Sequence, residues 1–213
     1  MVYILVEGHG EVEAISNLIN RLWQDLNLPF KPISSPPIRW KNIYRRQGLI
    51  KGCEYIRMKG NATGLLILHD SEDFCPKEVA PQKAQIIRDL NLPFPVSCVL
   101  MYREYEVLFL PCLDTMAGKK IIDPRGIERP GIIQGATFDG DFEARRDTKG
   151  IISSFFPRNR TYKPTTDQLA LTRMINFDLV RKAHVPCFGS LERGLSFIAN
   201  NQSGVYPSPI IVT

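Results

Sequence analysis

Residues 2–11 read VYILVEGHGE, and this stretch decides how the N-terminal part of the chain folds. Val2–Val6 is a run of apolar and β-branched residues, typical of a strand buried on both faces. After it, apolar residues recur at three- and four-residue intervals, which predicts an amphipathic helix, and two glycines allow a sharp turn between strand and helix. Glu7 is thus expected at the carboxyl end of a strand and Glu11 in the first helical turn. Ligands of parallel α/β sheets gather at this edge, so the two carboxylates suggest a divalent cation.

A second acidic segment follows another apolar run. Residues 64–68, GLLIL, predict a buried strand, and the chain then continues as His69, Asp70, Ser71, Glu72 and Asp73. Acids this close at a strand end repel one another unless a cation, solvent or hydrogen-bond donors compensate. Mg²⁺ and Mn²⁺ prefer such hard oxygen ligands. His69 is expected to be structural.

The order of strand and then acid occurs a third time. The apolar stretch Pro95–Tyr102 is followed by Arg103, Glu104, Tyr105 and Glu106, and a helix is expected over residues 103–113. A glutamate at a helix start serves the helix dipole as often as it binds a ligand. Glu104 and Glu106 are therefore second-tier candidates.

Alternating strands and helices predict an α/β fold with a mainly parallel sheet flanked by helices. The pattern weakens over residues 111–163, where irregular structure with a helix or two is expected. A helix starting at Thr165 or Thr166 and reaching Leu179, a short helix over 188–199, and an extended tail or edge strand over 206–213 complete the prediction. We expect one domain over residues 1–213, with its core at about 1–113 and a less regular helical extension at about 114–213.

The composition is that of an ordinary globular protein, with 213 residues, 44% hydrophobic and 23% charged. No apolar run approaches the roughly 18 residues needed to cross a bilayer, and the chain starts without a signal-peptide pattern. The five cysteines are scattered without metal-binding spacing. These features predict a cytoplasmic protein with reduced thiols and no membrane association.

The net charge of +5 gives a mild preference for polyanions, and its distribution is more informative. Between residues 31 and 59, basic side chains are interleaved with Trp40 and Tyr44 and accompanied by the single acid Glu54, a pattern that fits a phosphate-binding face. A second basic group lies over residues 145–163. Solvated surface is the alternative interpretation of both groups.

The acidic motifs, in this order, resemble those of the TOPRIM fold of topoisomerases, primases and OLD-type nucleases. An uncharacterised bacterial TOPRIM-like family is more similar in length and motifs. The matching segments are the EGHGE start, the central acidic loop over 69–73, the RExE segment over 103–106, and Tyr162-Lys163-Pro164. TOPRIM proteins use an acidic DxD-like motif with an aspartate at both ends. This chain departs from it with Asp70-Ser71-Glu72 followed by Asp73, so the second ligand can be either Glu72 or Asp73. The resemblance implies a partner ATPase in a defence-type system.

These features lead to the hypothesis of a Mg²⁺- or Mn²⁺-dependent nuclease acting on DNA or RNA. Glu11, Asp70 and either Glu72 or Asp73 would hold one or two ions, and Glu7 would be a further ligand or the general base. The second-tier residues are His9, for proton transfer or structure, Arg103 and Lys163, for phosphate or ordinary surface, and Glu104 and Glu106.

Two alternatives stay open. A catalytically inactive TOPRIM-like module that binds nucleotide or nucleic acid for a partner would carry the same carboxylates. Acidic loops that are merely solvated would point their carboxylates apart.

Overall fold

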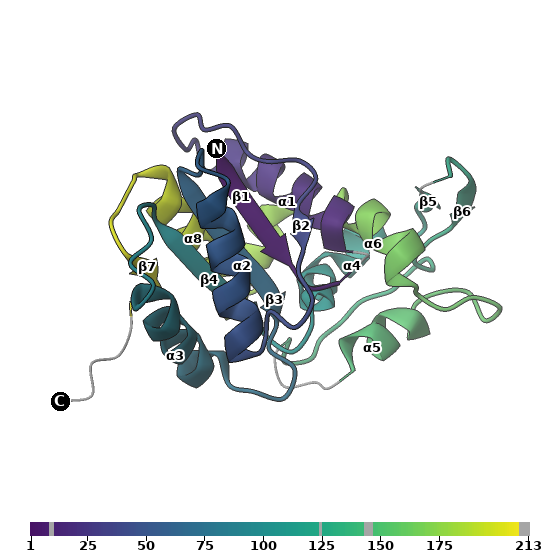
Figure 1. Ribbon diagram of the computed structural model, residues 1–213. Coiled ribbons are helices and arrows are strands. Elements are labelled where there is room, and N and C mark those ends of the chain that lie inside the picture. The colour runs from purple at the N-terminus through teal and green to yellow at the C-terminus, as the bar shows by residue number, and fades with distance from the viewer. Residues whose placement is uncertain (9–10, 124, 143–146, 209–213) are drawn as a thin grey trace.

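The computed structural model describes residues 1–8, 11–123, 125–142 and 147–208, and of Glu11 it describes the backbone alone. Its centre is a five-stranded parallel sheet in the order β2-β1-β3-β4-β7 (Figure 1). The strands are β1 (Val2–Val6), β2 (Ile38–Arg39), β3 (Gly64–Asp70), β4 (Val96–Met101) and β7 (Val205–Tyr206). The three central strands are buried almost throughout, which explains their unbroken apolar sequences.

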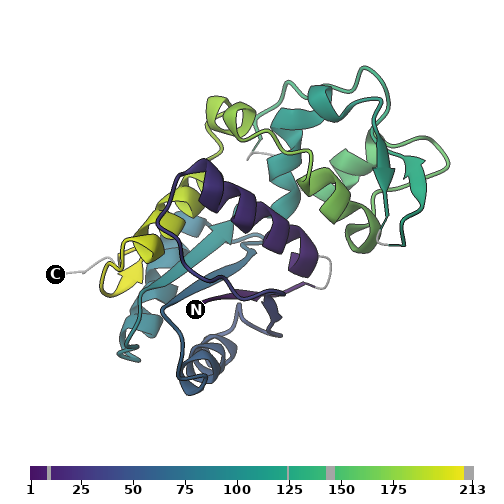
Figure 2. The ribbon, with the colours of Figure 1, turned by 90° about the horizontal axis from the view of Figure 1, so that it is seen from above.

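Helices cover both faces of this sheet, as Figure 2 shows from above. On one face, α1 and α8 pack against one cluster of buried side chains, and on the other face α2 and α3 pack against a second cluster. These helices are α1 (Glu11–Asp25), α2 (Arg46–Met58), α3 (Pro76–Arg88) and α8 (Pro186–Ala199). The prediction of an α/β fold with a parallel sheet flanked by helices is confirmed, and the arrangement is consistent with either a Rossmann-like or a TOPRIM-like fold.

The described residues between 113 and 182, called the extension from here on, lie on the side toward which the central strands point (Figures 1 and 2). α8 and β7 also fall in the expected range 114–213, but they belong to the layers of the central sheet. Buried side chains of the extension belong to the same hydrophobic cluster as those of β1 and β3. Arg21 on α1 links the helices of the central sheet to the extension, because its guanidinium donates hydrogen bonds to the carbonyls of Thr172 and Ile175 at 2.7 and 2.6 Å. The elements of the extension are α4 (Leu113–Met116), β5 (Lys120–Ile122), β6 (Glu128–Pro130), α5 (Thr148–Ser154), α6 (Pro164–Thr172) and α7 (Phe177–Lys182).

Two predicted helices differ from the observed ones. The segment expected to be helical over 103–113 contains a 3-10 helix, η1 (Tyr105–Cys112), in which nearly every residue is buried. The helix predicted from Thr165 or Thr166 to Leu179 is divided into α6 and α7. Asn176 explains the division, because its side-chain oxygen accepts the backbone N–H groups of Asp178 and Leu179 and thereby starts a new helix.

The extended tail or edge strand expected over 206–213 overlaps the edge strand β7, which pairs in parallel with β4 and ends at Tyr206. Residues 209–213 lie outside the described part of the chain. β5 and β6 form an antiparallel pair that the sequence did not predict. None of the helices in the described ranges has the length and apolar character needed to span a bilayer.

Candidate functional site

The loops that follow β3 and β4 are joined by backbone hydrogen bonds at the carboxyl edge of the sheet. Asp70 is in register with Met101, whose carbonyl accepts the N–H of Ser71 at 2.8 Å. The Ser71 hydroxyl in turn accepts the N–H of Arg103 at 2.8 Å, and the N–H of Glu72 donates to the carbonyl of Arg103 at 3.2 Å. Glu72 and Arg103 both have positive φ, at 53° and 61°, so each loop turns sharply beside the other. The acids that follow the two strands are therefore held close together.

Lys149, in the first turn of α5, lies among three of these acids. Its ammonium is 2.8 Å from Glu104 Oε1, 3.7 Å from Glu106 Oε2 and 3.8 Å from Asp70 Oδ2. Its backbone N–H also donates to Glu104 Oε2 at 3.0 Å. We call Asp70, Glu104, Glu106 and Lys149 the acid–lysine cluster. The Glu104 carboxylate thus accepts its hydrogen bonds from Lys149 of α5, and it does not cap the start of η1.

Glu106 is the buried member of the acid–lysine cluster, with no exposed surface. Tyr162 donates its hydroxyl to Glu106 Oε1 at 2.8 Å, while Oε2 accepts no hydrogen bond from any described residue. Burial raises the pKa of Glu106 above its ordinary value, and Lys149 and Tyr162 oppose the rise. Burial disfavours the charged form of Lys149, but the surrounding carboxylates outweigh it and raise its pKa. Lys149 is therefore a permanent cation at neutral pH.

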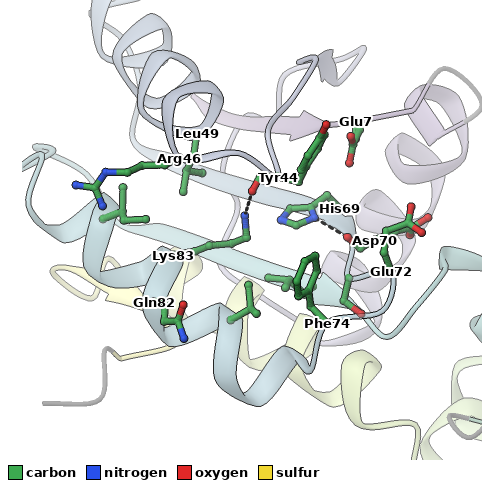
Figure 3. Close-up of a pocket in the computed structure, with 14 residues that line it drawn as sticks. Glu7, Tyr44, Arg46, Leu49, His69, Asp70, Glu72, Phe74, Gln82 and Lys83 are labelled. Carbon is green, nitrogen blue, oxygen red and sulfur yellow. Dashed lines mark hydrogen bonds between the residues drawn. The ribbon is translucent and has the colours of Figure 1, made fainter. Parts of the chain in front are cut away.

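A cavity of about 530 Å³ opens between α2 and α3 at the same edge of the sheet (Figure 3). Glu7, Asp70 and Glu72 line it on the acidic side. Its apolar lining comes from Tyr44, Leu49, Phe74, Val79, Ile86 and Leu100. Asp70 therefore belongs to two environments, since it lines this cavity and also contacts Lys149.

His69 and Lys83 are two buried polar residues of the cavity lining, and their nitrogens point toward one another in Figure 3. His69 Nδ1 donates to the carbonyl of Asp70 at 2.7 Å, because a carbonyl can only accept, whereas Nε2 is buried without a hydrogen-bond partner among the described residues. Burial, aided by the charge of Lys83, lowers the pKa of His69 to about 4. Lys83 donates to the carbonyl of Tyr44 at 2.7 Å, and burial lowers its pKa as well.

The structure separates the predicted second ligands of the acidic loop. Glu72 lines the cavity, whereas Asp73 forms an ion pair with Arg103 at 3.6 Å. Lys163 is exposed and precedes α6, and its own backbone N–H donates to Asp167. His9 and the side chain of Glu11 lie outside the described part of the chain.

The predicted carboxylates are partly brought together. Glu7 and Asp70 line one cavity, and Asp70, Glu104 and Glu106 share one lysine. Among the side chains that the structure describes, no three or more His, Cys, Asp or Glu residues form a group suited to hold a metal ion.

Sequence reasoning missed three residues of the site. Lys149 belongs in the sequence to the second basic group, over residues 145–163, and no local signal links it to Glu104, which is 45 positions away. Lys83 lies in the stretch from about Lys77 or Pro81 to Leu92, which the sequence predicts as a helix that packs through Ala84, Ile87 and Leu90. Tyr162 has a sequence signal, since it opens the Tyr162-Lys163-Pro164 motif, but Lys163 is the residue of that motif predicted for the site.

Comparisons with curated proteins and with solved structures gave no match. A family model does match, and it spans every element of the carboxyl edge described above, from the end of β1 to α8. The chain belongs to the family described as Domain of unknown function (DUF4276), whose model covers residues 6–196.

Proposed function

We propose that this protein is a Mg²⁺- or Mn²⁺-dependent phosphodiesterase that hydrolyses nucleic acid. The observation that carries the proposal is the position of Asp70. It lines the cavity together with Glu7 and Glu72, and it also contacts the lysine that binds Glu104 and Glu106. Acids at or just after the ends of β1, β3 and β4 thus lie at the sheet edge where parallel α/β proteins bind their ligands.

The described carboxylates at this edge offer the type of oxygen ligand that a hard divalent cation takes, and Glu11, whose side chain lies outside the described part of the chain, would have to complete the ligand set. Carboxylate oxygens are the ligands Mg²⁺ and Mn²⁺ prefer, and Glu106 Oε2 is a buried acceptor without a hydrogen bond among the described residues. Glu7, Glu11 and Asp70 would hold the ion. Glu72 is favoured over Asp73 as the additional ligand because Asp73 pairs with Arg103. A bound ion would acidify an attacking water and neutralise charge that develops on the phosphate.

The chain's own residues would bind and orient the phosphate. Lys149 keeps a positive charge beside Asp70, where it can neutralise a phosphate oxygen. Arg103 is a weaker candidate since its guanidinium already pairs with Asp73. Glu7, which lines the cavity, is the candidate to accept a proton from water.

A basic surface adjoins the cavity and supports a polyanionic substrate. Arg46 lines the cavity, and Lys41, Arg45 and Lys51 line a second hollow on the same segment of chain. Trp40, which also lines that hollow, stacks on Tyr55 with ring centroids 5.2 Å apart. Clustered cations beside aromatic rings are typical of single-strand binding surfaces. Action in the cytoplasm is a part of this proposal that stems from the sequence composition, and cooperation with an ATPase is a part that stems only from the resemblance to TOPRIM-like proteins.

One observation favours the alternative of an inactive binding module. Lys149 already supplies a cation to three carboxylates, so Asp70, Glu104 and Glu106 are compensated without a metal ion. In such a module the site would bind nucleotide or nucleic acid without cleaving it.

The two functions are separated by a cleavage assay. Purified protein is incubated with supercoiled plasmid, single-stranded DNA and RNA in Mg²⁺, Mn²⁺ or EDTA. We expect metal-dependent products from the wild type and from Asp178→Asn, a change at an exposed carboxylate on α7. Glu7→Gln and Asp70→Asn should lose at least about 100-fold in rate, the order of effect of deleting a catalytic group. Absence of cleavage with retained binding would favour the inactive module.

A further inference from the structure

The cavity between α2 and α3 has aromatic walls that the proposed hydrolysis leaves unexplained. Phe74 is 65% exposed, and Tyr44, 44% exposed, carries Arg45 over its ring at 5.3 Å. The two rings lie on either side of His69 in Figure 3. Large aromatic side chains held at the mouth of a cavity commonly mark a surface that binds a flat apolar ligand.

The floor of this cavity offers an acceptor next to a donor. His69 is 3% exposed, and its Nε2 has no hydrogen-bond partner among the described residues. Because Nδ1 carries the proton that is donated to Asp70, Nε2 of the neutral ring presents a lone pair. Lys83 is 7% exposed and gives one of its N–H groups to Tyr44, and the described residues supply no acceptor for the others. A buried polar atom without a partner is unfavourable, so this floor is suited to a ligand that satisfies both groups.

We propose that the cavity binds a nucleobase, either of a mononucleotide or of an unpaired strand. Each base presents a hydrogen-bond donor beside an acceptor on its pairing edge, which complements His69 Nε2 and Lys83, and its flat faces suit Phe74 and Tyr44. A volume of about 530 Å³ lies within the range of small-ligand sites. In a duplex this edge is already occupied by the partner base, so the bound base is unpaired.

The position of the cavity connects this inference to the proposed hydrolysis. Glu7, Asp70 and Glu72 line the same cavity, so a base bound on His69 would hold its own phosphate near the acidic edge. In this respect the inference rests on the proposed function and names its substrate class as unpaired nucleotides. Recognition of the base itself requires neither metal nor cleavage.

The test is equilibrium binding measured in EDTA, where cleavage cannot occur. The probes are the nucleosides adenosine, guanosine, cytidine and uridine, their 5′-monophosphates, and a single-stranded oligonucleotide beside the matching blunt duplex. We expect at least one nucleoside to bind, with affinity reduced about 5- to 100-fold in Phe74→Ala, the range of losing one base–aromatic stack. Lys83→Met should also weaken binding, whereas Phe30→Ala, at a 91% exposed ring outside the cavity, should not.

The outcomes distinguish the sources of the base. Tighter binding of the single strand than of the monophosphate assigns the site to an unpaired strand, and equal binding assigns it to mononucleotides. The inference is overturned if no nucleoside or nucleotide binds, or if Phe74→Ala and Lys83→Met bind as well as Phe30→Ala. Nucleoside binding without any metal-dependent cleavage would reject the proposed hydrolysis and leave base recognition standing.

Discussion

Replacement of Lys149 by methionine tests the acid–lysine cluster most severely. The change keeps an unbranched apolar stem and removes the ammonium that contacts Asp70, Glu104 and Glu106. Glu106 is fully buried, and among the described side chains Tyr162 would remain as its hydrogen-bond donor. Removing one partner of a buried ion pair destabilises a protein by about 3–5 kcal/mol. Because the Lys149 side chain is 39% exposed, solvent screening lowers the expected loss to about 2 kcal/mol.

The loss of folding stability in Lys149→Met should depend on pH, and the ionisation of Glu106 determines whether it grows or shrinks as the pH rises. Burial raises the folded-state pKa of Glu106 above its ordinary 4.5, so its ionisation costs stability as the pH rises through that raised value. Without Lys149 the cost is larger. At pH near 4 the Glu106 carboxyl is protonated in the folded protein, so the wild type and Lys149→Met should differ little in their free energy of unfolding. The difference should grow as the pH rises to 7.5.

The assay is urea unfolding at pH 4 and pH 7.5, with Lys77→Met, at an exposed residue of α3, as the control. At pH 7.5 the melting temperature of Lys149→Met should also fall by about 4–8 °C, since 1 kcal/mol shifts it by about 2–4 °C in a chain of this size. In a double-mutant cycle, Glu106→Gln should remove much of the penalty. Equal stability of the two lysine variants, or a loss of the same size at both pH values, would refute this account of the cluster.

Three further changes should affect stability in a defined direction, each checked by urea unfolding at pH 7.5. Tyr162→Phe removes the donor to Glu106 Oε1 and should cost about 1–2 kcal/mol, and an unchanged stability would mean that water replaces the hydroxyl. Asp167→Asn weakens the ion pair that Arg160 makes with a fully buried carboxylate and should cost about 3 kcal/mol, whereas Asp178→Asn, at an exposed carboxylate, should stay within about 0.5 kcal/mol. Gly64→Ala would place Cβ 2.5 Å from Ile198 Cγ2 and should cost about 1–3 kcal/mol, which a wild-type stability would contradict.

The sheet could be predicted because burial on both faces leaves a direct record in the sequence. β1, β3 and β4 are unbroken apolar runs, and each is followed by acids at the edge where ligands bind. The helices beside them follow from their apolar periodicity. In η1 that periodicity is lost, because Tyr105–Leu110 are all buried, and the sequence could not distinguish a 3-10 helix from an α-helix.

The acids of the site could be predicted, whereas their partners could not. Strand order brings Asp70 beside the end of β4, and neighbouring strands can be inferred from the sequence. Lys149 lies on α5, which follows α4, β5 and β6 in the chain, and tertiary packing rather than a nearby sequence pattern brings it to the same place. A lysine in a basic run usually belongs to solvated surface, and only its contacts with Glu104 and Glu106 identify it as part of the site.

The most direct measurement is the anomalous diffraction of a crystal soaked in Mn²⁺. Our account predicts a manganese peak bound by the carboxylates of Glu7 and Asp70, with Glu11 or Glu72 as a further ligand, and no such peak in Asp70→Asn. Manganese found only at exposed acids away from the carboxyl edge, with Asp70 in contact with Lys149 alone, would contradict it.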